Sequence, residues 1–196
     1  MSDLSYAAPA RFSPLGLQAR PAHIKAAAVL LGTLVLAIAS QISVPMVPVP
    51  MTMQTLAVML VGALYGWRLG ALTILAWLGE AAVGLPVLAN GTGGLAPFMG
   101  PTAGYLASFP LVAVLVGWLA ERGWNGGRPG FAFAAMLAGH VLCLALGGLW
   151  LAILIGPEKA LLAGVVPFLL GSLVKSGLGA TILMALARRT NKAEQA

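Results

Sequence analysis

A lysine, Lys175, lies in a segment, residues 160–187, that is otherwise apolar up to Ala187. If this segment is a helix with 3.6 residues per turn, one of its faces carries Phe168, Ser172, Lys175 and Gly179. A lysine at the centre of a membrane helix costs about 3 kcal/mol on insertion scales, so such a face should point at a cavity or another helix and not at lipid. We expect the ammonium to meet a carboxylate or carbonyl group of a bound molecule. The alternative is that Lys175 reaches the membrane surface or pairs with Glu80, the only acidic residue inside an apolar segment.

Ser172 and Lys175 also match the S-x-x-K spacing of some serine acyl enzymes, which raises the alternative of an intramembrane Ser/Lys hydrolase. The companion motifs S-D-N and K-T-G are absent from the sequence, and so are H-E-x-x-H and G-x-S-x-G. The stretch GSLVKS resembles a phosphate-binding loop, but Val174 stands where that loop requires glycine. We therefore expect neither an enzyme nor a chain that hydrolyses ATP by itself.

The composition predicts an integral membrane protein. Of the 196 residues, 60% are hydrophobic and only 8% are charged, which is too little polar surface to cover a water-soluble core. The net charge of +6 comes from basic residues in short loops and near the termini, so membrane orientation explains it and no nucleic-acid partner is expected. Cys143 is the only cysteine, which excludes a disulfide within the chain, and no cofactor or metal site is expected.

Six apolar segments are long enough for membrane helices or shorter, protein-buried ones: residues 24–43, 51–65, 69–88, 99–120, 130–155 and 160–187. The predicted fold is therefore an all-α membrane protein with six transmembrane helices. Residues 1–22 are predicted to be an N-terminal cytoplasmic tail, residues 23–190 the membrane domain, and residues 191–196 a C-terminal cytoplasmic tail.

The basic residues predict the orientation of these helices. With six spans, nine of the eleven lysines and arginines fall on one side of the membrane, which places both termini in the cytoplasm. Lys159 lies on the other side and Lys175 within the membrane. The outer connections, residues 43–51 and 89–105, are uncharged and rich in proline and glycine. Irregular apolar backbone near a membrane must pack on protein or line a cavity, so we expect a ligand cavity near the outer face.

Three stretches resemble one family of membrane proteins: VPVPMTMQTLAVMLVGALYGWRLG, GLPVLANGTGGLAPFMGPTAGYL and PFLLGSLVK. They are similar to the BioY family of biotin transporters, the substrate-binding S components of energy-coupling factor (ECF) transporters, over residues 41–187. The resemblance implies a six-helix protein of the bacterial inner membrane that binds biotin near the outer face. It also implies partners, namely a transmembrane coupling subunit and two cytoplasmic ATPases, although some family members are encoded alone and self-association stays open.

The resemblance further implies which residues bind the cargo. Motif positions assign substrate binding to Thr52, Gln54, Asn90, Gly93, Gly94, Tyr105, Ser172 and Lys175. Ser172 departs from the family pattern, since an aspartate usually precedes the lysine at this spacing. Biotin combines an apolar ring and chain with a ureido group and a carboxylate, which suits a mostly apolar pocket with a few polar groups. Lys175 could serve either the carboxylate or the ureido oxygen, and another small carboxylated vitamin is the alternative cargo.

Overall fold

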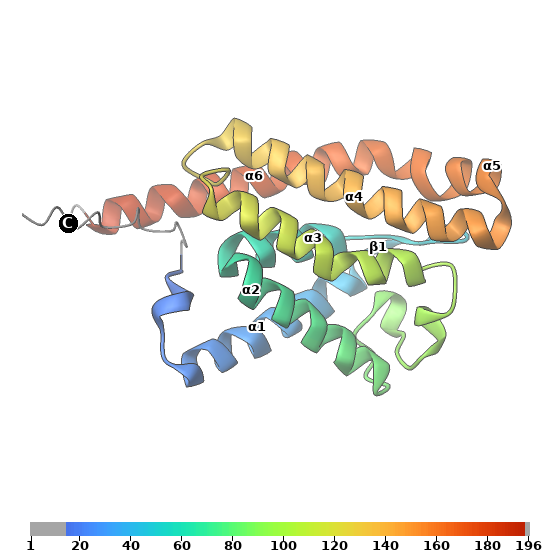
Figure 1. Ribbon diagram of the computed structural model, residues 1–196, viewed down its shortest axis with the longest axis horizontal. Coiled ribbons are helices and arrows are strands. Elements are labelled where there is room, and N and C mark those ends of the chain that lie inside the picture. The colour runs from blue at the N-terminus through green and yellow to red at the C-terminus, as the bar shows by residue number, and fades with distance from the viewer. Residues whose placement is uncertain (1–14, 195–196) are drawn as a thin grey trace, which may run out of the picture.

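The computed structural model describes residues 15–194, and most of them are helical. The long helices are α1 (Ala22–Gln41), α2 (Gln54–Ala82), α3 (Ala103–Glu121), α4 (Pro129–Ile155) and α6 (Val166–Glu194). Within the described residues, five helical stretches are long and apolar enough to cross a membrane. Figure 1 shows α4 and α6 side by side along the longest axis. Further contacts join α4 to α3, α3 to α2, and α2 to α1, so the helices pack as one bundle.

Helix α2 is two helical segments that turn at Gly66. This glycine has φ 80° and ψ 166°, a backbone conformation that residues with a side chain rarely adopt. The segments fold back on each other, because a Cβ atom added to Gly70 would lie 2.9 Å from Cα of Gly62. Residues 54–65 form a helix of only about 18 Å, which is too short to cross a hydrocarbon core of about 30 Å without help from the surrounding protein, and most of its residues are buried. The sequence predicted two segments here, residues 51–65 and 69–88, separated by a short connection.

The last membrane stretch combines α5 (Pro157–Ala160), a π-helical turn η4 (Leu161–Val165) and α6. Pro167 lies in the first turn of α6, where its missing N–H leaves a carbonyl of the preceding turn without its regular partner. The irregular π-helical turn therefore directly precedes the proline that interrupts this segment of the sequence. Helix α6 then continues to Glu194, so residues 191–194 of the predicted C-terminal tail are helical.

Part of the predicted N-terminal tail packs on the helices. Residues 1–14 lie outside the described part of the chain, but a 3-10 turn, η1 (Leu17–Ala19), precedes α1. Leu17 is buried, and Gln18 Nε2 donates a hydrogen bond of 2.8 Å to Glu121 Oε1 at the end of α3. This contact fixes the chain before α1 at the end of the bundle where α2 turns at Gly66. A Cβ atom added to Gly66 would meet the side chains of both Gln18 and Glu121.

Two irregular connections lie toward the opposite end of the molecule from the end of α6 (Figure 1). Between α1 and α2, strands β1 (Ser43–Val44) and β2 (Met51–Thr52) pair antiparallel, with Ser43 opposite Thr52. Between α2 and α3, the chain forms two 3-10 turns, η2 (Ala89–Gly91) and η3 (Ala96–Phe98). Hydrogen bonds join the two connections: Gln41 Nε2 donates to the Leu88 carbonyl at 3.1 Å, and the Ser43 hydroxyl donates to Asn90 Oδ1 at 2.9 Å.

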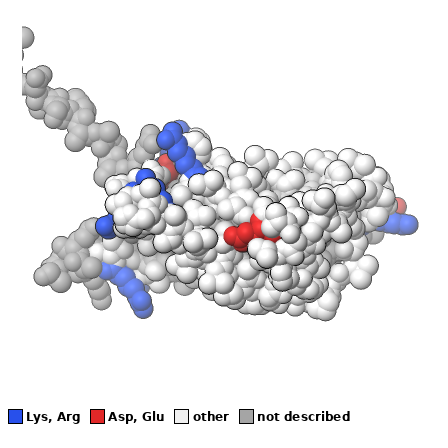
Figure 2. Space-filling model, turned by 90° about the horizontal axis from the view of Figure 1, so that it is seen from below, with Lys and Arg blue, Asp and Glu red and all other residues white. Residues whose placement is uncertain are grey.

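Charged residues are concentrated at the ends of the molecule. Figure 2 shows lysine and arginine side chains gathered around the end where α6 finishes, and others at the far end. The face between these ends is almost free of charge apart from one acidic patch (Figure 2). An uncharged belt between charged ends is the surface that a membrane requires.

Candidate functional site

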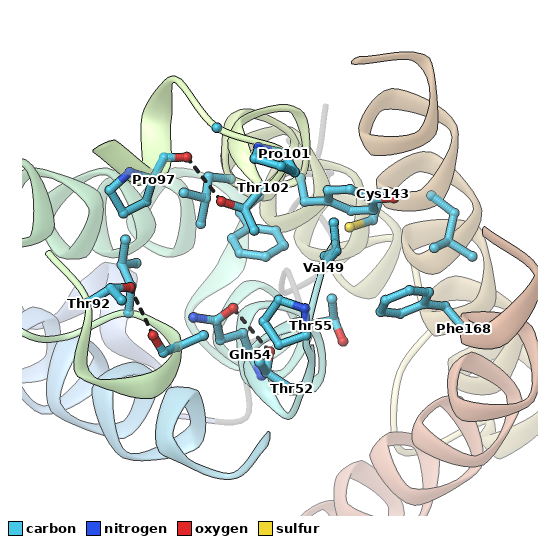
Figure 3. Close-up of a pocket in the computed structure, with 18 of the residues that line it drawn as sticks. Val49, Thr52, Gln54, Thr55, Thr92, Pro97, Pro101, Thr102, Cys143 and Phe168 are labelled. Carbon is cyan, nitrogen blue, oxygen red and sulfur yellow. Dashed lines mark hydrogen bonds between the residues drawn. The ribbon is translucent and has the colours of Figure 1, made fainter. Parts of the chain in front are cut away.

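A cavity of about 300 Å³ lies beneath the two irregular connections. The β hairpin, the connection between α2 and α3, and helices α3, α4 and α6 all contribute to its wall. Figure 3 shows Thr52, Gln54 and Thr55 on one side, with Pro101 and Thr102 across from them and Phe168 on a third side. Six of the eight residues that the sequence predicted for substrate binding line this cavity: Thr52, Gln54, Asn90, Tyr105, Ser172 and Lys175.

The wall is mostly apolar with a few polar groups. Side chains such as Val49, Leu106, Phe109 and Leu144 supply the apolar part. Trp77 is fully buried behind this wall, stacks on Phe109 with 6.1 Å between ring centroids, and donates from Nε1 to the Val87 carbonyl at 3.1 Å. A wall of this composition fits a small amphiphilic molecule, and the volume is at the lower end for ligand pockets.

Lys175 is the only lysine or arginine among the described residues of the cavity wall. Its Nζ donates to the Thr52 carbonyl at 2.7 Å and lies 3.3 Å from the Thr55 hydroxyl. Both partners are uncharged and belong to the hairpin end and the start of α2, so in the described structure the ammonium is not paired with Glu80. An ammonium has three N–H donors, and these two contacts leave one for a bound molecule. The sequence prediction that Lys175 faces a cavity is thus matched by its position.

Thr52 and Gln54 form a buried hydrogen-bonded unit with Ser40. The Thr52 hydroxyl donates to Gln54 Oε1 at 3.0 Å, and Gln54 Nε2 donates to Ser40 Oγ at 2.9 Å (Figure 3 shows the Thr52–Gln54 contact). Ser40 in turn donates to the Leu36 carbonyl at 2.7 Å. These contacts fix the Gln54 amide between α1 and the hairpin and leave the second N–H of Nε2 for another acceptor.

Tyr105 contributes its ring to the cavity and its hydroxyl to the fold. The hydroxyl donates to the Gly164 carbonyl in the π-helical turn at 2.7 Å, and the ring stacks on Phe168 with centroids 6.3 Å apart. The bond explains how a carbonyl in this irregular turn is satisfied inside an apolar region. Tyr105 therefore presents an aromatic face to the cavity, while its proton is engaged elsewhere.

Asn90 and the two glycines lie in the connection after α2 but play different parts. Asn90 lines the cavity in the left-handed conformation that asparagine tolerates, with φ 57°. Gly93 and Gly94 do not line it. A Cβ on Gly93 would lie 2.3 Å from the Leu85 carbonyl oxygen, and the Gly94 N–H donates to the Ala81 carbonyl at 2.7 Å. Gly93 therefore lets the backbone pack closely, and Gly94 adopts a φ of 76° that residues with a side chain rarely adopt. Both reasons differ from the substrate binding that the resemblance implied.

Ser172 is buried and lines the cavity one turn before Lys175. The hydrogen bonds of Lys175 go to Thr52 and Thr55, so in the described residues the lysine is not arranged as the base of a Ser172 nucleophile. With serine in this position, no carboxylate accompanies Lys175 among the described wall residues.

Several wall residues on α4 and α2 were not predicted from the sequence. His140, Cys143 and Leu144 line the cavity together, and Thr55 adds a hydroxyl beside Lys175. His140 also makes the helix contact expected of a histidine in a membrane span, since Ser176 Oγ of α6 lies 3.1 Å from its Nδ1. The spacing i, i+3, i+4 of the three α4 residues was the signal that they share a face. Among residues 15–194, no group of three His, Cys, Asp or Glu side chains could hold a metal ion.

Comparison with known proteins shows which family this chain belongs to. The model of the BioY family matches residues 14–192. This chain belongs to the BioY family. A probable biotin transporter BioY of Pyrococcus horikoshii is 36% identical over 153 residues, which cover 78% of this chain and 90% of that protein. The biotin transporter BioY of Rhizobium etli is 40% identical over 149 residues, covering 72% and 79%.

A solved structure shares the fold of this BioY-family chain. It is the crystal structure, at 2.1 Å, of the S component for biotin from an ECF-type ABC transporter. The two superpose with a TM-score of 0.74 and 26% sequence identity, over 87% of this chain and 95% of the other. The α-helical architecture described above is therefore that of an S component.

Proposed function

We propose that this chain takes up biotin: the vitamin binds in the cavity beneath the two connections and then crosses the membrane. The observation that carries the proposal is the amphiphilic cavity with a single ammonium group, in a chain of the BioY family. The chain is a transport component and not an enzyme, and biotin is its cargo, so the function needs no cofactor.

The proposed contacts follow from the chemistry of the wall. The apolar side chains would cover the ring and chain of biotin, with Tyr105 and Phe168 offering aromatic faces. The free N–H of Lys175 would donate to the carboxylate or to the ureido oxygen. Thr52, Gln54, Asn90 and Ser172 would supply the other polar contacts, while Gly93 and Gly94 shape the connection that carries Asn90.

Titration of the purified protein with biotin tests this proposal. We expect saturable binding with one site per chain, measured by calorimetry in detergent or nanodiscs. An absence of saturable binding would contradict it. Competition by dethiobiotin and by unrelated carboxylated vitamins decides between biotin and the alternative cargo, because dethiobiotin retains the ureido group and the carboxylate. Preference for another vitamin would leave the S component role and change the substrate.

We further propose six membrane crossings with both termini in the cytoplasm and the cavity toward the outer face. The turn at Gly66 supports two crossings for α2, the first of them short and enclosed by protein. The basic residues support the orientation, since Arg20 before α1 and the arginines Arg68 and Arg128 lie near one end of the bundle and Lys159 lies near the other. The setting proposed is the inner membrane of a bacterial cell.

The proposed partners are a transmembrane coupling subunit and two cytoplasmic ATPases. Support comes from the structural relative, which is the S component of an ECF-type ABC transporter, and from the lack of a phosphate-binding loop in this sequence. Purification from the native membrane tests this point. Recovery of the chain alone or as an oligomer of itself would favour a solitary carrier.

A further inference from the structure

His140 is a buried polar side chain in the cavity wall with an unsatisfied nitrogen. The residue is 2% exposed, yet it lines the cavity from the middle of α4. Its Nε2 has no hydrogen-bond partner in the described structure and almost no surface that water could reach. Leaving a buried polar atom unpaired costs about 1 to 3 kcal/mol, so this nitrogen calls for a partner that the protein itself does not supply.

The contacts of the other ring nitrogen determine what that partner must be. Nδ1 lies 3.1 Å from the Met136 carbonyl oxygen, one turn earlier on α4. A carbonyl oxygen only accepts hydrogen bonds, so this contact is favourable when Nδ1 carries the proton. In this tautomer the fully buried Ser176 hydroxyl of α6, with its Oγ 3.1 Å from Nδ1, accepts from the same N–H. In the neutral ring with this tautomer, Nε2 is an acceptor and needs a donor.

Biotin, the cargo proposed above, offers few donors. At neutral pH its carboxylate carries only acceptors, its ring sulfur and hydrocarbon chain carry no N–H or O–H, and the two ureido N–H groups are its only donors. A carboxylate placed against the Nε2 lone pair would meet acceptor with acceptor. Only the ureido end of biotin therefore matches this part of the wall.

We propose that His140 is a specificity-determining residue whose Nε2 accepts a hydrogen bond from one ureido N–H of the cargo. Met136 and Ser176 are the positioning residues that set its tautomer and ring orientation. His140 lines the cavity but its Nε2 is closed off in the described structure, so this contact requires the wall to open toward Nε2 when the cargo binds. This inference rests on biotin being the cargo and adds which end of the vitamin enters between α4 and α6.

Biotin analogues in which a single ureido N–H is replaced by CH2 test the assignment. The replacement removes one donor at nearly constant size. We expect the unaltered protein to bind one of the two analogues about 10- to 100-fold more weakly than the other, because only one N–H faces Nε2. In His140→Phe this difference between analogues should disappear, and in His140→Gln, which keeps an acceptor, part of it should remain. His140→Leu serves the same purpose as His140→Phe if the larger ring prevents folding.

The outcomes separate the two proposals. If the unaltered protein binds no biotin, the proposed function fails and this inference fails with it. If it binds biotin but treats the two analogues alike, or if His140→Phe and His140→Leu keep the discrimination, His140 is a packing residue and only the present inference is overturned. A purely structural role would lower affinity for biotin and both analogues by the same factor.

Discussion

The Nζ of Lys175 lies 2.7 Å from the carbonyl oxygen of Thr52, a residue 123 positions earlier in the chain. This bond ties the β hairpin between α1 and α2 to the middle of α6, at the wall of the cavity. The same ammonium therefore holds the hairpin in place and lies in the cavity wall, with one N–H left for a bound molecule.

Replacing Lys175 with methionine should weaken biotin binding about 10- to 100-fold, because it removes a charge-assisted hydrogen bond while keeping much of the side-chain volume. Calorimetric titration measures the loss. Lys159→Met is the matched control, since Lys159 is exposed at the far end of the bundle and outside the cavity. Equal affinity of the Lys175 and Lys159 variants would show that the ammonium does not contact the cargo.

Replacing Gln54 with leucine should lower the thermal unfolding temperature and weaken biotin binding. The change deprives the Thr52 hydroxyl of its acceptor and removes a donor from Ser40, all in a buried site, and unpaired buried polar groups cost about 1 to 3 kcal/mol. Unfolding followed by dye-based thermal scanning in detergent gives the shift. Thr181→Val removes an exposed hydroxyl that bonds only within α6, and we expect it to change little. A Gln54→Leu protein as stable as Thr181→Val would refute the role of this unit.

Replacing Gly147 with alanine should destabilise the protein and disturb the cavity together. An added Cβ would lie 2.2 Å from Cδ1 of Tyr105, whose ring is held by its stacking on Phe168 and by its bond to Gly164. Overpacking of this kind costs about 1 to 3 kcal/mol, and here it also displaces a cavity ring. Gly177→Ala is the control on α6, because nothing lies within 4 Å of its added Cβ. If the two alanine variants unfold at the same temperature and bind biotin alike, the packing described for Tyr105 is not what positions its ring.

The sequence could predict those features of the molecule that depend on the type of side chain, such as the apolar helices and the position of a charge within one of them. Apolar length marked the helices, and the lysine on a ring and hydroxyl face of residues 160–187 marked a cavity-facing position. The partner of Lys175 could not be predicted, because it is a main-chain carbonyl that any residue at position 52 would present.

The two glycines after α2 illustrate another limit. Close backbone packing and close ligand approach both require glycine, so the sequence pattern is the same in the two cases. At Gly93 the structure identifies packing as the reason, because an added Cβ would collide with the Leu85 carbonyl oxygen. The spacing of His140, Cys143 and Leu144 indicates that the three share one helix face, which is compatible with a place in a cavity wall. A lone histidine on an apolar helix is equally expected to make a helix–helix contact. In the structure it is both, since the ring touches Ser176 and lines the cavity.

The turn at Gly66 predicts where the chain meets water on each side of the membrane. Cys143 is the only cysteine, so a Cys143→Ala background that still binds biotin allows single cysteines to be placed at will. Arg68, Arg128 and Lys159 are exposed, and replacing each in turn with cysteine samples both ends of the bundle. With six crossings, a membrane-impermeant maleimide should label Lys159→Cys on intact cells, and Arg68→Cys and Arg128→Cys only after permeabilisation. If α2 crossed the membrane once without turning, position 68 would lie in the hydrocarbon region and would resist labelling under both conditions.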